Sequence, residues 1–205
     1  MNPKFALSVG VVALTVCQTG QARDVTRLLA GEYLQLGYAT CIIAPPGASF
    51  NPVTLAAPQG STVSTFTLQG TRVFNGDGTG QDSGIAASLN LPNASGFAGG
   101  AFSTSFSGPF TYTVDDALNI TMIQAPFYST ALSGPGVGTA TLVSDVPPLK
   151  GRISHDLTTI TFQHETPAVE TISGPGPNNT TITRQRICVR ERTATRVKRG
   201  QHNED

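Results

Sequence analysis

Alternation of apolar and polar side chains in short segments is the feature that most constrains the fold of this chain. In PFTYTV, residues 109–114, Phe110, Tyr112 and Val114 occupy every second position, and LNITMI, residues 118–123, alternates in the same way. A period of two residues places such side chains on one face of an extended strand. The intervening DDA is a turn sequence, so the two segments predict a β-hairpin.

The same alternation returns along most of the chain. It predicts further strands over residues 31–43, 61–74, 83–91, 127–144, 150–154, 157–163 and 180–193. Residues 23–30 are expected to form a short helical or irregular lead-in, and residues 93–108 a mobile loop. Roughly seven to nine strands without helical interludes predict an all-β fold, an antiparallel up-and-down barrel of about eight strands. A β-sandwich is the alternative.

The composition favours an all-β domain over a helical one. Charged residues make up 13% of the chain, and Gly and Pro number 22 and 14, which suits a protein of many turns. Disorder is the competing interpretation, but 39% hydrophobic residues in alternating runs favour a folded domain. The formal net charge of zero gives no reason to expect nucleic acid or an anionic membrane as the main partner.

The N-terminus has the pattern of an export signal. Lys4 precedes the apolar run FALSVGVVALTV, and GQA ends in a small residue, so residues 1–22 are predicted to be a signal peptide. The alternative is a lipoprotein anchored through Cys17. Residues 23–196 then form one barrel domain and 197–205 a disordered tail. No later segment is apolar enough to span a membrane, so we expect a soluble exported protein, periplasmic or extracellular.

Two cysteines remain after removal of such a signal. Cys41 and Cys188 are an even pair in an oxidising compartment and predict a disulfide that ties the first strand to the last. Two separate buried thiols are the alternative. A bridge between the first and last strands favours a barrel, because one sheet closed on itself brings those strands together.

The segment RVFNGDGTGQD, residues 72–82, has the acidic and glycine residues of a calcium loop. Asn75, Asp77 and Thr79 match its first three ligand positions, but Ala86 stands where a bidentate glutamate is required. Asn-Gly and Asp-Gly also supply the positive φ angles of tight hairpin turns. The segment therefore predicts a turn and not a metal site.

No motif in the chain predicts a cofactor, a metal site or a catalytic centre. The three histidines lack metal-ligand spacing, and there is no Cys-x-x-Cys, Gly-x-Ser-x-Gly or phosphate-binding loop. His155 beside Asp156, and His164 beside Glu165, are expected to face solvent in turns. Catalytic residues remain unassigned, and the pattern leans against an enzyme.

The last predicted strand carries the most regular charge pattern. Arg184, Arg186, Arg190 and Arg192 share a face with Cys188, whereas Ile187 and Val189 share the other. We expect Ile187 and Val189 to face the core, with the arginines and the disulfide outside. Cys41 agrees with this, because it lies on the smaller face of residues 31–43, opposite Leu34, Leu36, Tyr38 and Ile42. In the alternative the arginines point inward and hold a carboxylate or phosphate group.

With the strands placed, the chain resembles small secreted calycin barrels, in particular bacterial proteins with an allene oxide cyclase-like barrel. The segments that carry the likeness are GEYLQLGYATC, FNGDGTG, YTVDDALNIT and KGRISHDLTTITF, within residues 31–192. The resemblance implies a barrel whose apolar interior holds a small lipophilic ligand; the cyclases rearrange a fatty-acid epoxide there. No position matches the cyclase catalytic residues, and Tyr33 replaces the tryptophan of the lipocalin opening.

These observations predict a binding module that lodges a small hydrophobic molecule in the barrel. Its expected lining residues are Phe66, Leu68, Tyr112 and Ile120, and a filled core is the alternative for each of them. A cyclase or isomerase that uses the same cavity is a second hypothesis and needs inward polar residues. A surface-interaction protein that uses residues 93–108 is a third. The oligomeric state and the ligand are left open.

Overall fold

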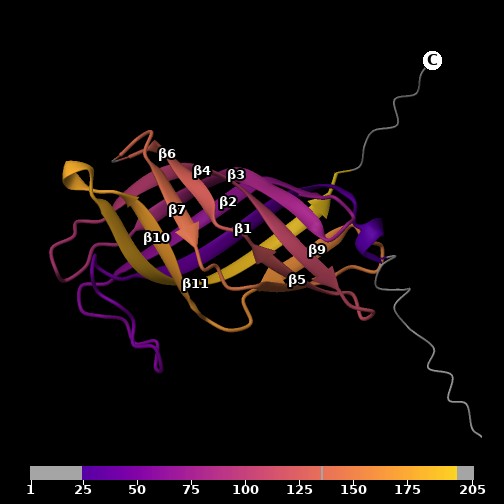
Figure 1. Cartoon of the computed structure of the whole chain (residues 1–205), viewed down its shortest axis with the longest axis horizontal. Coiled ribbons are helices and arrows are strands. Elements are labelled where there is room, and N and C mark those ends of the chain that lie inside the picture. Colours follow the sequence, from indigo (N-terminus) through magenta and orange to yellow (C-terminus); the bar gives the residue numbers. More distant parts are fainter. Residues whose placement is uncertain (1–24, 135, 198–205) are drawn as a thin grey trace, which may run out of the picture.

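The computed structural model describes residues 25–134 and 136–197, and within them one antiparallel sheet closes on itself (Figure 1). The sheet has eleven strands, and its first and last strands pair along their length, from Tyr33 opposite Arg196 to Ile43 opposite Arg186. The predicted all-β fold, an antiparallel barrel of about eight strands, is confirmed, because the eleven-stranded sheet contains a ring of eight strands. The strands are β1 (Gly31–Ile43), β2 (Thr62–Phe74), β3 (Thr79–Asn90), β4 (Gly100–Val114), β5 (Asn119–Gln124), β6 (Phe127–Ser133), β7 (Ala140–Ser144), β8 (Leu149–Ile153), β9 (Thr159–Gln163), β10 (Val169–Pro175) and β11 (Thr181–Arg196).

Five long strands, β1 to β4 and β11, run the length of the barrel, and three pairs of short strands complete it. β5 and β6 pair with β4 one after the other. β9 and β10 pair in the same way with β11, and β7 and β8 lie between these pairs. β5, β8 and β9 therefore close the ring at one end, and β6, β7 and β10 close it at the other.

In each of the three pairs of short strands, β5 and β6, β7 and β8, and β9 and β10, the break between the two strands contains proline. The breaks hold Pro126, the pair Pro147–Pro148, and Pro167. Proline has no N–H to donate to a ladder, so it interrupts pairing where it occurs. At the third break, residues 164–168 pass three residues of β11 without pairing, and His164 Nδ1 lies 3.0 Å from the Cys188 carbonyl. The imidazole thus replaces a missing strand partner.

The predicted turns are confirmed at one end of the barrel. In the turn 75–78 the Asp77 carboxylate accepts hydrogen bonds from the backbone and side chain of Thr79. In the turns 115–118 and 154–158, Asp115 accepts hydrogen bonds from the side chain and backbone of Asn119, and Asp156 from the side chains of Ser154 and Thr158. These bonds hold the pKa of all three carboxyl groups below the usual value, to about 2 for Asp156. The acidic residues of the glycine-rich segment therefore shape a hairpin.

That end of the barrel is filled by large apolar side chains. Phe74 packs edge-on against Tyr33, Phe110 and Tyr112, with ring centroids 4.9–5.3 Å apart. A helical turn over residues 25–28 covers the end, and Tyr112 donates a hydrogen bond to the Thr26 carbonyl. The other buried members are Leu29, Val114, Ile120, Met122, Leu149, Ile153, Ile160, Phe162 and Ala194. We call this end the closed end.

Three sequence predictions about the strands are wrong. Residues 100–108 of the predicted mobile loop 93–108 belong to β4, and β10 was not anticipated. The buried face of β1 carries Tyr33, Gln35, Ala39 and Cys41, whereas the four side chains that were expected to share the apolar face, Leu34, Leu36, Tyr38 and Ile42, are exposed by 38–65%. Hydrophobic alternation marks the correct period in β1 but the wrong face. The predictions for residues 1–22 and 198–205, signal peptide and disordered tail, lie outside the described residues.

Candidate functional site

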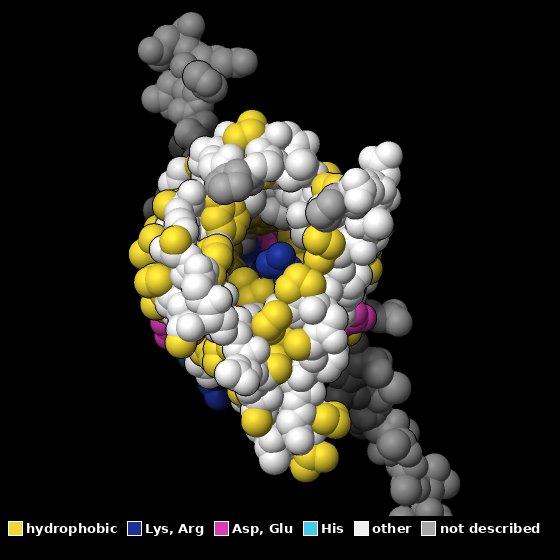
Figure 2. Space-filling view, turned by 90° about the vertical axis from the view of Figure 1, so that its left-hand side faces the viewer, with side chains coloured by type: hydrophobic (Ala, Val, Ile, Leu, Met, Phe, Trp, Pro, Cys, Tyr) yellow, Lys and Arg dark blue, Asp and Glu magenta, His cyan; other side chains and the backbone are white. Residues whose placement is uncertain are grey.

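The other end of the barrel is an open cup. Figure 2 looks into it and shows a hollow with hydrophobic side chains around it and Lys or Arg side chains at its bottom. The cavity has a volume of about 490 Å³, which falls within the range of small-molecule sites, roughly 300–1,000 Å³. Its apolar walls include Ile43, Phe66, Leu68, Phe97, Phe102, Phe106, Phe127, Val143 and Ile172, and its floor includes Gln124, Arg190 and Arg192.

The cup is hollow because small side chains occupy many inward positions of its wall. The small lining residues are Ser64, Ala86, Ser88, Ala101, Thr104, Ser129, Ala131, Thr139 and Thr141. An eight-stranded barrel is just wide enough for large side chains to fill, as they do at the closed end. Where alanine, serine and threonine replace them, space for a ligand remains.

A layer of buried charged groups separates the cup from the closed end. Arg72 and Asp82 face each other across the β2–β3 hairpin and form two hydrogen bonds of 2.7 Å. The Arg72 guanidinium also lies over the rings of Phe110 and Phe162, with its carbon 5.5 and 4.7 Å from their centroids. Gln35 donates to the Asp82 carboxylate at 3.4 Å. Arg72 is therefore a paired, positioned cation of the core.

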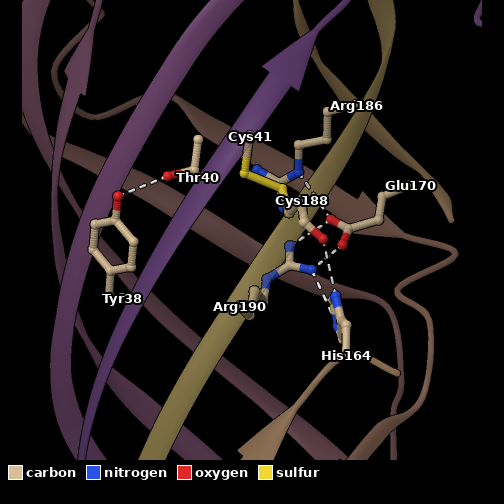
Figure 3. Close-up of a disulfide and its surroundings, with 8 residues drawn as sticks. All are labelled: Tyr38, Thr40, Cys41, His164, Glu170, Arg186, Cys188 and Arg190. Carbon is tan, nitrogen blue, oxygen red and sulfur yellow. Dashed lines mark hydrogen bonds and ion pairs between the residues drawn. A yellow bond between two sulfur atoms is a disulfide. The ribbon is translucent and has the colours of Figure 1, made fainter. Parts of the chain in front are cut away.

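A second ion-pair cluster lies beside the disulfide (Figure 3). Glu170 on β10 is fully buried and accepts hydrogen bonds from both Arg186 and Arg190 on β11, the former at 2.9 Å. Burial raises the pKa of Glu170, but the two guanidinium groups outweigh it and hold the pKa below its usual value. Burial, assisted by the charge of Arg190, lowers the pKa of His164, so its ring is neutral at pH 7.

Arg192 differs from these arginines because it has no close partner. Among the described residues its guanidinium makes no hydrogen bond, and its Nε and Nη1 are buried without one. Its nearest carboxylate oxygen belongs to Asp82, at 3.8 Å from Nη1, and that carboxylate already binds Arg72. Burial, followed by the charge of Arg72, lowers the pKa of Arg192 to about 9. The side chain is thus a charged donor at neutral pH that lines the cup.

The polar layer carries an excess of positive charge. Four arginines, Arg72, Arg186, Arg190 and Arg192, face two carboxylates, Asp82 and Glu170, which leaves two positive charges uncompensated. An isolated charge in a low-dielectric interior is costly, so such an arrangement favours an anion in contact with it. The cup therefore combines an apolar wall with an anion-attracting floor.

The disulfide prediction is confirmed, but the predicted orientation of its strand is wrong. Cys41 and Cys188 form a bridge, and both are buried on the inner face. Val189, which was expected in the core, is 61% exposed, while Arg190 and Arg192 on the alternate face are at most 9% exposed. The inward alternative for the arginines is the observed one. The bridge fixes which face of β11 points inward. When Cys188 reaches Cys41 inside the barrel, the arginines two and four residues away point inward as well.

The four predicted lining residues divide between the two ends of the barrel. Phe66 and Leu68 line the cup, whereas Tyr112 and Ile120 belong to the filled core of the closed end. His155 is exposed in its turn as expected, but His164 is half-buried beside Arg190 rather than facing solvent. Among the described residues, no group of three or more His, Cys, Asp or Glu side chains is placed to hold a metal ion.

Arg72, Asp82 and Gln124 were not predicted from the sequence as site residues, although it contains one signal for the first pair. In a hairpin that turns at residues 75–78, residues 72 and 82 are cross-strand partners, and Arg72 has the same parity as Phe66 and Leu68, which were expected inside. An arginine and an aspartate paired on an inner face predict a buried ion pair. Gln124 carries no comparable signal, because only the closure of the ring brings it to the cup floor.

No known protein family, characterised protein or solved structure matches this chain. The likeness to allene oxide cyclase-like barrels stays a prediction. The disulfide is compatible with an exported protein. Among residues 25–134 and 136–197, no helix has the length and apolar character needed to cross a membrane.

Proposed function

We propose that the protein binds a small amphiphilic molecule, whose apolar part lies in the open cup and whose anionic group, a carboxylate in the simplest case, contacts Arg192. The carrying observation is the buried Arg192 guanidinium without a hydrogen bond, at the floor of an otherwise largely apolar cavity. Buried donors left unsatisfied cost about 1–3 kcal/mol each, and a ligand carboxylate removes that cost on binding. The proposed function thus accounts for a buried guanidinium that the fold alone leaves without a hydrogen bond.

The neighbouring charges support the same ligand chemistry. Arg190 also lines the cup, and its partner Glu170 is shared with Arg186, so the floor stays positive after these pairs are counted. A neutral lipophilic ligand gains free energy from burial against the apolar walls, but it forms no charged hydrogen bond with the arginines of the floor. A hydrogen bond to a charged group contributes about 1.5–3 kcal/mol, which corresponds to roughly 10- to 150-fold in Kd.

Matched ligands test this proposal. Dodecanoate and 1-dodecanol share an alkyl chain and differ in the charged group, so wild-type protein is expected to bind the carboxylate at least about tenfold more tightly by calorimetry. Arg192→Met is expected to remove this preference, whereas Arg152→Met, at an exposed site on the outer wall near the closed end, leaves it unchanged. Equal affinity of the wild type for the two ligands contradicts the proposal.

A catalytic role in the same cup is the second candidate, and one observation favours it. The inward polar residues that a cyclase or isomerase requires are present, with Gln124, Arg190 and Arg192 at the floor and neutral His164 behind Arg190. A bound ligand recovered chemically changed after incubation, and unchanged with Arg190→Gln, supports catalysis. Recovery of the unchanged ligand from wild-type protein supports binding alone.

A further inference from the structure

The two ends of the barrel differ sharply in charge. The four loops at the open end, residues 44–61, 91–99, 134–139 and 176–180, contain no Asp, Glu, Lys, Arg or His. All three turns between strands at the closed end contain aspartate. The first charged residue after the last of the open-end loops is Arg184, which is exposed and lines the cup.

The same uncharged loops and the strand ends beside them carry exposed apolar side chains. Val53 is 88% exposed, Val137 63%, Leu132 49% and Phe97 42%. They come from three segments that surround the mouth of the cup, and Figure 2 shows hydrophobic surface at several points around the hollow. Exposed apolar side chains gathered around a ligand pocket, without charges among them, are typical of a contact surface rather than of a solvated end.

We propose that this open end docks on an uncharged or zwitterionic lipid surface, from which the cup takes up its ligand or to which it delivers it; this inference rests on the proposed function. An amphiphile that leaves a bilayer through a mouth in contact with lipid keeps its alkyl chain out of water. Charged side chains resist entry into the apolar layer, and the four open-end loops carry none. Basic residues that attract anionic headgroups are also absent from the loops, so apolar contact supplies the binding.

Two tryptophan reporters test the contact. The chain contains no Trp, so Val53→Trp places a single fluorophore at the open end, and Leu28→Trp places one at an exposed position of the closed end. With phosphatidylcholine vesicles we expect a blue shift of the emission for Val53→Trp alone. No shift with either variant, or an equal shift with both, overturns the docking proposal.

A charge variant tests the same contact in the chain without tryptophan. The double variant Val53→Asp with Val137→Asp is expected to lower vesicle partitioning, measured by sedimentation, by about tenfold or more, while Leu28→Asp leaves it within about twofold. Equal partitioning of the double variant and wild type overturns the proposal. Absence of vesicle binding together with self-association that the double variant abolishes also overturns it, and assigns the face to a second copy of the chain.

The proposed ligand of the cup and the proposed lipid contact of the open end can be refuted independently of each other. Dodecanoate binding in vesicle-free solution depends on the cup floor, and the double variant is expected to retain it. Wild-type protein that binds dodecanoate but not vesicles overturns the docking proposal alone, whereas wild-type protein that binds vesicles through its open end but not dodecanoate overturns the proposed ligand.

Discussion

Arg192→Met should make the free protein more stable. The fall of the Arg192 pKa from the usual arginine value to about 9 corresponds to roughly 4–5 kcal/mol against the charged form. The largest cause is burial, and the repulsion from Arg72 exceeds the attraction of Asp82. Methionine has no polar atoms to desolvate and fits a similar space, although it loses that attraction. We therefore expect the free energy of unfolding to rise by roughly 1–3 kcal/mol.

Arg190→Met is the matched control, two residues earlier on the same face of β11. It removes two hydrogen bonds from Glu170, which is fully buried and then keeps Arg186 as its one strong partner. Breaking a buried ion pair in this way costs about 3–5 kcal/mol. The two arginine variants should thus change stability in opposite directions.

Urea unfolding at pH 7 with the disulfide intact measures both variants. The midpoint should rise for Arg192→Met and fall for Arg190→Met, with m-values close to that of the wild type. A loss of stability in Arg192→Met as large as that in Arg190→Met refutes the reasoning, because Arg192 then has a stabilising partner in the fold. Combined with loss of carboxylate binding, a stabilised Arg192→Met identifies a residue kept for function at a cost in stability.

Three further outcomes follow from the cup and the bridge. Affinity for saturated carboxylates should improve by about 0.8 kcal/mol, or roughly fourfold in Kd, for each added methylene until the cup is full; a flat calorimetric series argues against an alkyl chain in the cup. Carboxylate affinity should be maintained from pH 7 toward about 9 and weaken above it, because Arg192 loses its charge as the pH rises through the pKa of about 9; equal affinity at pH 7 and at about 10 excludes Arg192 as the contact. Replacing Cys41 and Cys188 together by alanine should lower the unfolding free energy by up to about 5 kcal/mol, since the bridge closes a separation of 147 residues; a change below about 1 kcal/mol in urea unfolding contradicts this.

Local sequence signals predicted most of the strands and the turns between them. The alternation around DDA predicts residues 109–114 of β4, β5 and the turn at Asp115, and NGDG predicts the β2–β3 hairpin. These elements depend on neighbours in the chain, so they are readable without the fold. β10 was missed because its segment VETISGP follows a proline break and holds only two large apolar residues, Val169 and Ile172.

Local signals do not determine which face of each strand points into the barrel. In β4 and β5 the apolar side chains point inward, as expected, because those segments lie at the closed end, where a filled core needs them. Apart from Tyr33 and Ala194 at the closed end, the inner faces of β1 and β11 carry polar, small and charged residues, since they line the polar layer and the cup. The rule that the more apolar face is buried holds only where the interior is a core.

The sequence by itself determined an all-β fold of antiparallel strands, because hydrophobic period and turn residues depend on neighbours in the chain, and its cysteine pair favoured a barrel over a sandwich. Only the tertiary structure decided that four arginines and two carboxylates lie inside, and that one end is filled while the other is hollow. Ring closure brings Glu170 to Arg190 and Arg192 to Asp82 from strands far apart in the chain. The burial and the repulsion from Arg72 that lower the pKa of Arg192 exist only once all eight strand positions are in place.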